Sequence, residues 1–146
     1  MSADFRPSPP RWFVAVAAAL LLWGMTGCMM FYLHIAFGPA MDPQATDWDR
    51  AYYAALPGWF TPVYAVAVVG ALLGSLALLL RSRWAVPLYV LSLAGVVIQF
   101  GYVLLGTGLI AHKGAMTVVP LPLVIVAVAG FQLWLARRAA ARGWIW

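Results

Sequence analysis

Residues 76–90 read Leu-Ala-Leu-Leu-Leu-Arg-Ser-Arg-Trp-Ala-Val-Pro-Leu-Tyr-Val. Two arginines, Arg81 and Arg83, separate two long apolar runs in this stretch. An apolar run of roughly 20 residues is long enough to cross a bilayer as a helix, at about 1.5 Å per residue. A connection this short must turn the chain straight back, so the stretch predicts two antiparallel helices joined at a membrane surface.

Four such apolar runs occur along the chain, at about 12–37, 58–80, 84–110 and 118–136. Inside a bilayer the backbone has no water to bind, so each run must satisfy its own hydrogen bonds as a helix. We therefore expect an all-α fold, a bundle of four transmembrane helices that forms a single integral membrane domain over residues 1–146.

The composition agrees with a membrane protein. Of the 146 residues, 65% are hydrophobic and 9% are charged, and the mean hydropathy is +0.91. A soluble domain carries about 25% charged residues, because its surface must face water. A soluble globular protein is therefore excluded.

The cations predict the orientation. Threading four spans places seven of the nine lysines and arginines on the side of the termini, and leaves Arg50 and Lys113 on the other side. The seven are Arg6, Arg11, Arg81, Arg83, Arg137, Arg138 and Arg142. Because positive loops stay in the cytoplasm, we expect cytoplasmic termini in a bacterial inner membrane. These cations sit at the ends of apolar runs rather than on one face, which argues against nucleic acid as a partner.

The long connection at 38–57 predicts a short amphipathic helix on the outer surface. Asp42 followed by Pro43 is one predicted start, and Thr46 with Asp49 is a second, weaker one. An irregular loop is the alternative. The residues that recur at helical spacing are Trp48, Tyr52, Ala55 and Leu56.

Small residues mark the faces on which the helices are expected to pack. Membrane helices associate through close backbone contact and shared polar contacts, which favours glycine at interfaces. Gly70 and Gly74 form a small-xxx-small pair on the second run, and Gly95 lies on the corresponding stripe of the third. We expect these three glycines to face a neighbouring helix.

Four polar side chains are predicted to share one depth in the outer half of the bundle: His34, Tyr64, Gln99 and Tyr102. Each lies on the small and polar stripe of its own helix. They form the candidate outer pocket, a site for a small polar or polar-headed ligand. The alternative is a hydrogen-bonded packing cluster near the membrane surface, where tyrosine and histidine are common.

The sequence lacks the residues that several function classes need. No charged residue lies deep within a span, which argues against a proton-coupled exchanger. No catalytic set, metal cluster or cofactor motif is apparent, so we predict neither an enzyme nor a bound metal or cofactor. The segment ending at Cys28 is similar to a lipoprotein cleavage site, but the residues after it stay apolar, so we expect no cleavage.

Several segments together resemble a family of small bacterial four-helix membrane proteins that automatic labels often describe as sugar transporters. The segments are Tyr53 with Pro57-Gly58-Trp59, Gly70 with Gly74-Ser75, Leu78 to Ala85, and Leu91-Ser92-Leu93-Ala94-Gly95. The resemblance covers roughly residues 20–135 and implies a role in sugar transport.

The sequence is consistent with two functions. The first is an accessory, structural or partner-binding membrane subunit, whose partners are the bilayer and either further copies of itself or a larger membrane complex. The alternative is a facilitator or binding protein for a small uncharged solute such as a sugar, acting as an oligomer because four helices do not easily enclose a path alone.

Overall fold

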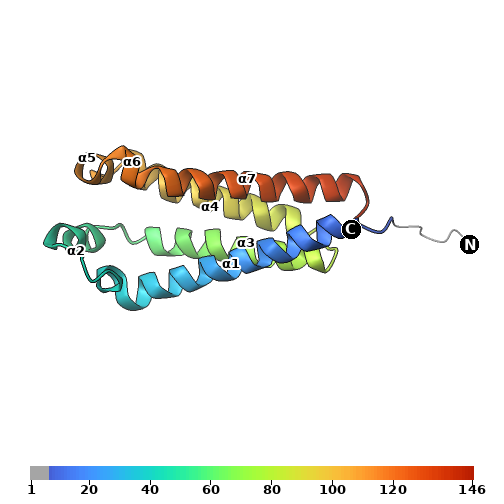
Figure 1. Cartoon of the computed structure of the whole chain (residues 1–146), viewed down its shortest axis with the longest axis horizontal. Coiled ribbons are helices and arrows are strands. Elements are labelled where there is room, and N and C mark those ends of the chain that lie inside the picture. Colours follow the sequence, from blue (N-terminus) through green and yellow to red (C-terminus); the bar gives the residue numbers. More distant parts are fainter. Residues whose placement is uncertain (1–6) are drawn as a thin grey trace, which may run out of the picture.

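The computed structural model describes residues 7–146, which form seven α-helices and one 3-10 helix (Figure 1). The elements are α1 (Arg11–Phe37), η1 (Gly38–Met41), α2 (Asp47–Ala54), α3 (Phe60–Leu79), α4 (Ala85–Leu105), α5 (Leu109–Lys113), α6 (Ala115–Val118) and α7 (Pro120–Ala141). The helices α1, α3, α4 and α7 are long and apolar enough to cross a membrane. The predicted all-α bundle of four spans is therefore confirmed; Arg6 lies outside the described residues.

Two of the spans end at different residues from those expected. The third span ends at Leu105 rather than near residue 110, because Gly106 and Gly108 disfavour a helix. The fourth continues beyond residue 136 to Ala141, since arginine and alanine are strong helix formers. It ends just before Gly143, whose φ of +75° suits glycine.

The four spans form a row in which only neighbours pack along their length. α3 packs against both α1 and α4, and α4 packs against α7. Figure 1 shows the resulting elongated bundle, with α2, α5 and α6 gathered at one end and the C-terminus at the other. We call the first the distal end and the second the terminal end.

Glycines set the closest approach between α3 and α4. A Cβ added to Gly70 would lie 3.0 Å from a backbone oxygen of α4, and one on Gly74 would lie 2.7 Å from the Tyr89 ring. On the facing helix, a Cβ on Gly95 would lie 3.1 Å from Ala67. Each glycine predicted to pack thus lies where a larger side chain has no room. On the other side of α3, Gly24 of α1 approaches the backbone in the same way.

The terminal end holds a packed apolar core. Side chains from all four spans meet there, among them Phe13, Leu78, Tyr89 and Leu135, each at most 1% exposed. α1 and α7 therefore come together at this end, although they are not neighbours in the row.

Arg81 joins three segments at the terminal end. Its Nε donates to the Trp144 carbonyl at 3.0 Å, and its Nη2 donates to the Pro7 carbonyl at 2.9 Å. The backbone N–H of Trp146 also donates to the Arg81 carbonyl, and that of Arg83 to the Trp146 carbonyl, both at 3.0 Å. These bonds, which we call the Arg81 clasp, fix the turn after α3 to both ends of the described chain.

We predict that Gly70→Leu and Gly74→Leu will each destabilise the bundle by about 1–3 kcal/mol, because the added side chain overpacks the α3–α4 contact. Unfolding in detergent micelles measures the change. Gly101→Leu is the matched control, because an added Cβ there meets nothing within 4 Å. A Gly74→Leu variant as stable as the parent would show that α3 and α4 do not pack in this register.

Candidate functional site

A cavity of about 700 Å³ occupies the distal half of the bundle. All four spans line it, and side chains of α2 and α5 reach its distal mouth. The core at the terminal end closes it below, because α1 and α7 meet there. The cavity is therefore closed at the terminal end and extends toward the distal end.

The burial of α7 shows how the cavity narrows. Leu121, Ile125, Ala129 and Gln132 line the cavity and follow one another at helical spacing. Leu121 is 65% exposed, Ile125 is half-buried, and Ala129 and Gln132 are 4% and 1% exposed. The cavity is thus wide near the start of α7 and ends close to Gln132, near the middle of the span.

Three of the four residues predicted to share an outer pocket lie on this cavity. His34, Tyr64 and Gln99 line it. Tyr102 does not, because its ring packs edge-on against Trp59 at 5.0 Å. Tyr102 follows Gln99 by three residues, which turns it by about 60° around the helix, and this turn is enough to direct it away from the cavity.

Aromatic rings form one wall of the cavity. The His34 ring lies 5.3 Å from the Tyr64 ring and also 5.3 Å from the Tyr53 ring. Phe60 lies 5.9 Å from the same histidine. These rings come from α1, α2 and α3, so the wall joins two spans to the short helix above them.

Gln132 is a buried polar residue of the cavity that the sequence analysis did not predict. Its side chain is 1% exposed, and its Nε2 is buried with no hydrogen-bond partner among residues 7–146. A buried polar group without a partner costs about 1–3 kcal/mol. The signal was a single amide, between Phe131 and Leu133, in the middle of an apolar span, where polar residues mark functional sites.

The distal mouth is covered by contacts between α2 and α5. Lys113 Nζ lies 2.6 Å from an Asp49 carboxylate oxygen. Beside this ion pair the rings of Trp48 and His112 stack at 3.8 Å, with 5° between their planes. We call these two helices and their contacts the lid, because Asp49 and Lys113 themselves line the cavity.

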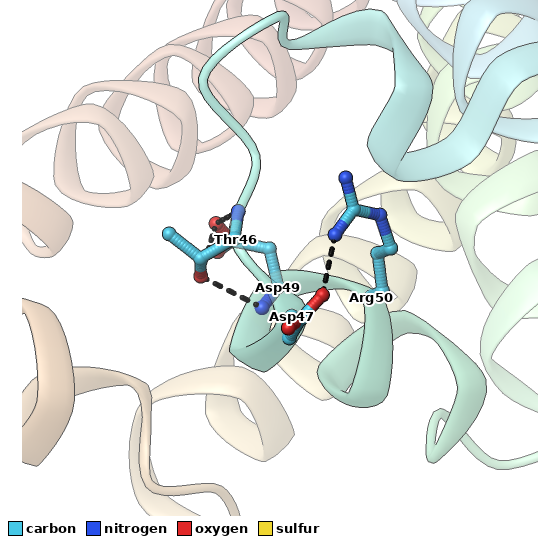
Figure 2. Close-up of polar contacts among 4 residues, drawn as sticks. All are labelled: Thr46, Asp47, Asp49 and Arg50. Atoms are coloured by element: carbon cyan, nitrogen blue, oxygen red, sulfur yellow. Dashed lines mark hydrogen bonds and ion pairs between the residues drawn. The ribbon is translucent and has the colours of Figure 1, made fainter.

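A capping box fixes where α2 begins (Figure 2). The Thr46 hydroxyl accepts the backbone N–H of Asp49 at 3.3 Å, and the Asp49 carboxylate accepts the backbone N–H of Thr46 at 2.8 Å. The amphipathic helix thus starts from Thr46, the second of the two predicted starts. Asp42 instead accepts the N–H two residues later and holds a turn. Arg50 pairs with Asp47 on the outer side of α2, at 2.7 Å.

Asp49 is therefore held by both of its oxygens. The hydrogen bond from Lys113, followed by the one from the Thr46 backbone, lowers the pKa of Asp49 from its usual 3.8 to about 2. Its carboxylate stays charged at any physiological pH, which keeps the lid paired.

Comparisons of the chain with protein-family models, with curated proteins and with solved structures find no match. Within residues 7–146 no group of three or more His, Cys, Asp or Glu side chains is arranged to hold a metal ion. The cavity and its lid are therefore the features on which a function must be argued.

We predict that Asp49→Asn will increase hydrogen exchange at the α5 amides by roughly two- to fivefold at pH 6, because it removes the ion pair that holds the lid. A carboxylate whose pKa is lowered in the folded state contributes stability above its unfolded pKa, near 4, and loses it as the pH falls through about 2. The difference between variant and parent should therefore shrink between pH 4 and pH 2.

The matched control is Asp47→Asn, which changes an acid of the same helix that pairs with Arg50 rather than with Lys113. The lid assignment fails if this control has the same effect on α5. It also fails if the effect of Asp49→Asn persists unchanged at pH 2.

Proposed function

We propose that this chain is an integral membrane protein that binds a small uncharged solute in its distal cavity. The observation that carries the proposal is the cavity, closed at the terminal end, whose base holds an amide without a partner among residues 7–146. A volume of about 700 Å³ is within the range of about 300–1,000 Å³ that small-molecule sites occupy.

The lining favours an uncharged solute. Among the described residues that line the cavity, the charged ones are Asp49 and Lys113, and these pair with each other in the lid. Deeper in the membrane an ion would find no opposite charge, and burying an unpaired charge is costly.

The lining also favours a solute that is mostly apolar over a sugar. Apolar side chains from all four spans cover most of the cavity wall. The Ser92 hydroxyl already donates to the Ala67 carbonyl at 2.7 Å. A sugar has a hydroxyl on almost every carbon, and each one left without a partner would cost about 1–3 kcal/mol. A compact apolar body with one or two hydrogen-bonding groups suits Gln99 and Gln132 better.

We further propose that the termini and the turn at 81–83 face the cytoplasm of a bacterial inner membrane, because the cations concentrate there. The cavity then opens away from the cytoplasm. An accessory subunit without a solute is the competing function, and it would be favoured if the solutes tested below fail to bind.

A reporter tests the orientation. Alkaline phosphatase, which folds only outside the cytoplasm, should be inactive when fused after Trp146 and active when inserted between Gln44 and Ala45. A fluorescent protein that matures only in the cytoplasm, fused at the same two places, is the control and should give the opposite pattern. An active phosphatase after Trp146 would reverse the proposed orientation.

Thermal unfolding in lipid nanodiscs tests binding. Menthol or cyclohexanone should raise the melting temperature by a few degrees, because a ligand at ten times its Kd adds about 1.4 kcal/mol, whereas glucose should not. Ile125→Trp should abolish the gain, since the residue lines the cavity. Val124→Trp should retain it, since this neighbouring residue is 51% exposed and does not line the cavity. Equal gains in both variants would mean that the solutes act on the bilayer alone, and the proposal would fail.

A further inference from the structure

The cavity has a second opening, between α1 and α7. The two helices meet through the core at the terminal end and diverge toward the distal end (Figure 1). Trp23 and Met30 on α1 line the cavity, although they are 37% and 46% exposed. Leu121 lines it from α7 and is more exposed still. Side chains that both line a cavity and remain exposed mark its rim, so the cavity continues outward between these helices.

This side opening lies at the depth of the lipid chains. Trp23 is near the middle of α1, and Leu121 and Ile125 belong to the distal half of α7. Among the described residues, the rim of this side opening consists of apolar side chains and the polar but uncharged Thr26. The hydroxyl of Thr26 is already committed, because it donates to the Leu22 carbonyl of its own helix at 3.0 Å. An opening of this kind admits hydrocarbon rather than water.

The base of the cavity, in contrast to its apolar rim, favours a polar group on the occupant. Gln132 is almost completely buried, lines the cavity and has an Nε2 group without a partner among residues 7–146. This amide nitrogen is a donor, so it requires an acceptor such as a carbonyl oxygen. An occupant with an acceptor that reaches Gln132 at the base and an apolar part at the rim satisfies both demands.

We propose that the occupant is a lipid-like molecule taken from the bilayer, with a carbonyl or ester oxygen that accepts from Gln132 Nε2 and a chain that leaves between α1 and α7. This proposal rests on the proposed function and names the solute class of the same cavity. The lid then covers the aqueous side, while exchange with the membrane takes place through the side opening.

A helix from a second copy or from a partner protein does not suit the space. A helix with its side chains is about 10–12 Å across, so three turns of it fill roughly 1,200 Å³ or more. The cavity holds about 700 Å³. A helix would also present no free backbone acceptor to Gln132, because its carbonyls are bonded within the helix. A single hydrocarbon chain with one polar group meets both requirements.

Photo-cross-linking in nanodiscs tests the proposal with two probes that differ only in the acceptor. One is hexadecanoic acid methyl ester with a diazirine at the far end of the chain, and the other is hexadecane with the same diazirine. The parent should incorporate at least about five times more ester than hydrocarbon. Gln132→Leu should reduce the ester to the hydrocarbon level while melting at or above the parent's temperature. Phe131→Leu, at the next position but outside the cavity lining, should keep the preference.

The position of the label decides the path of the chain. Mass spectrometry should find the chain-end label on the rim, at Trp23, Met30 or Leu121. Labels confined to the lid, at Tyr53 or Leu109, would overturn the side opening. Equal labelling by the two probes in the parent would overturn the Gln132 contact. If menthol or cyclohexanone stabilises the protein through the cavity but the ester shows no preference, the proposed function stands and the lipid proposal fails. If neither binds, both fail.

Discussion

The close approach of α3 to its two neighbours is the constraint on which the rest of the structure depends. Gly70 and Gly95 bring α3 and α4 into backbone contact on one side, and Gly24 of α1 does the same for α1 and α3 on the other. In lipid the hydrophobic effect does not drive helices together. Close contacts of this kind stabilise the association by van der Waals packing instead. The helix α7 lacks this contact with α3 and packs on α4 instead. The bundle is therefore a curved row rather than a closed ring.

In a curved row the first and last helices are not neighbours. Here α1 and α7 are joined by a packed core at the terminal end only. The buried core with Phe13 and Leu135 joins α1 to α7 at the terminal end. At the distal end the short helices α2 and α5 bridge the gap through the Asp49–Lys113 ion pair and the stacked rings of Trp48 and His112. The space between these two closures is the cavity. Its shape thus follows from which helix pairs pack along their length.

Much of the fold could be predicted from the sequence, because the four apolar runs and the three glycines depend on local composition. The predicted helix ends were less accurate, because hydropathy alone does not decide where a helix stops. Glycines beyond Leu105 end α4 early, and helix formers before Gly143 extend α7. Depth along antiparallel helices predicted that His34, Tyr64 and Gln99 lie at one level, and they line one cavity. Rotation around a helix could not be predicted as well, which is why Tyr102 lies elsewhere.

Gln132 and the lid were not predicted, for a different reason. A single amide in the fourth span does not by itself indicate a cavity, so Gln132 could not be assigned to the site from the sequence. The pairing of Asp49 with Lys113 joins residues far apart in the sequence, and no local pattern indicates it. Features that depend on which loops meet in space need the tertiary structure.

The Arg81 clasp has a consequence for biosynthesis. Its acceptors include the carbonyl of Trp144, and Trp146 bonds to the same turn. Residues 142–146 are made after all four spans, so the terminal end has no clasp until they have left the ribosome. Translation proceeds from the N-terminus, so this end can close only after all four spans have been made. A chain released before Trp144 would carry every span and still lack the bond that joins its turn to its tail.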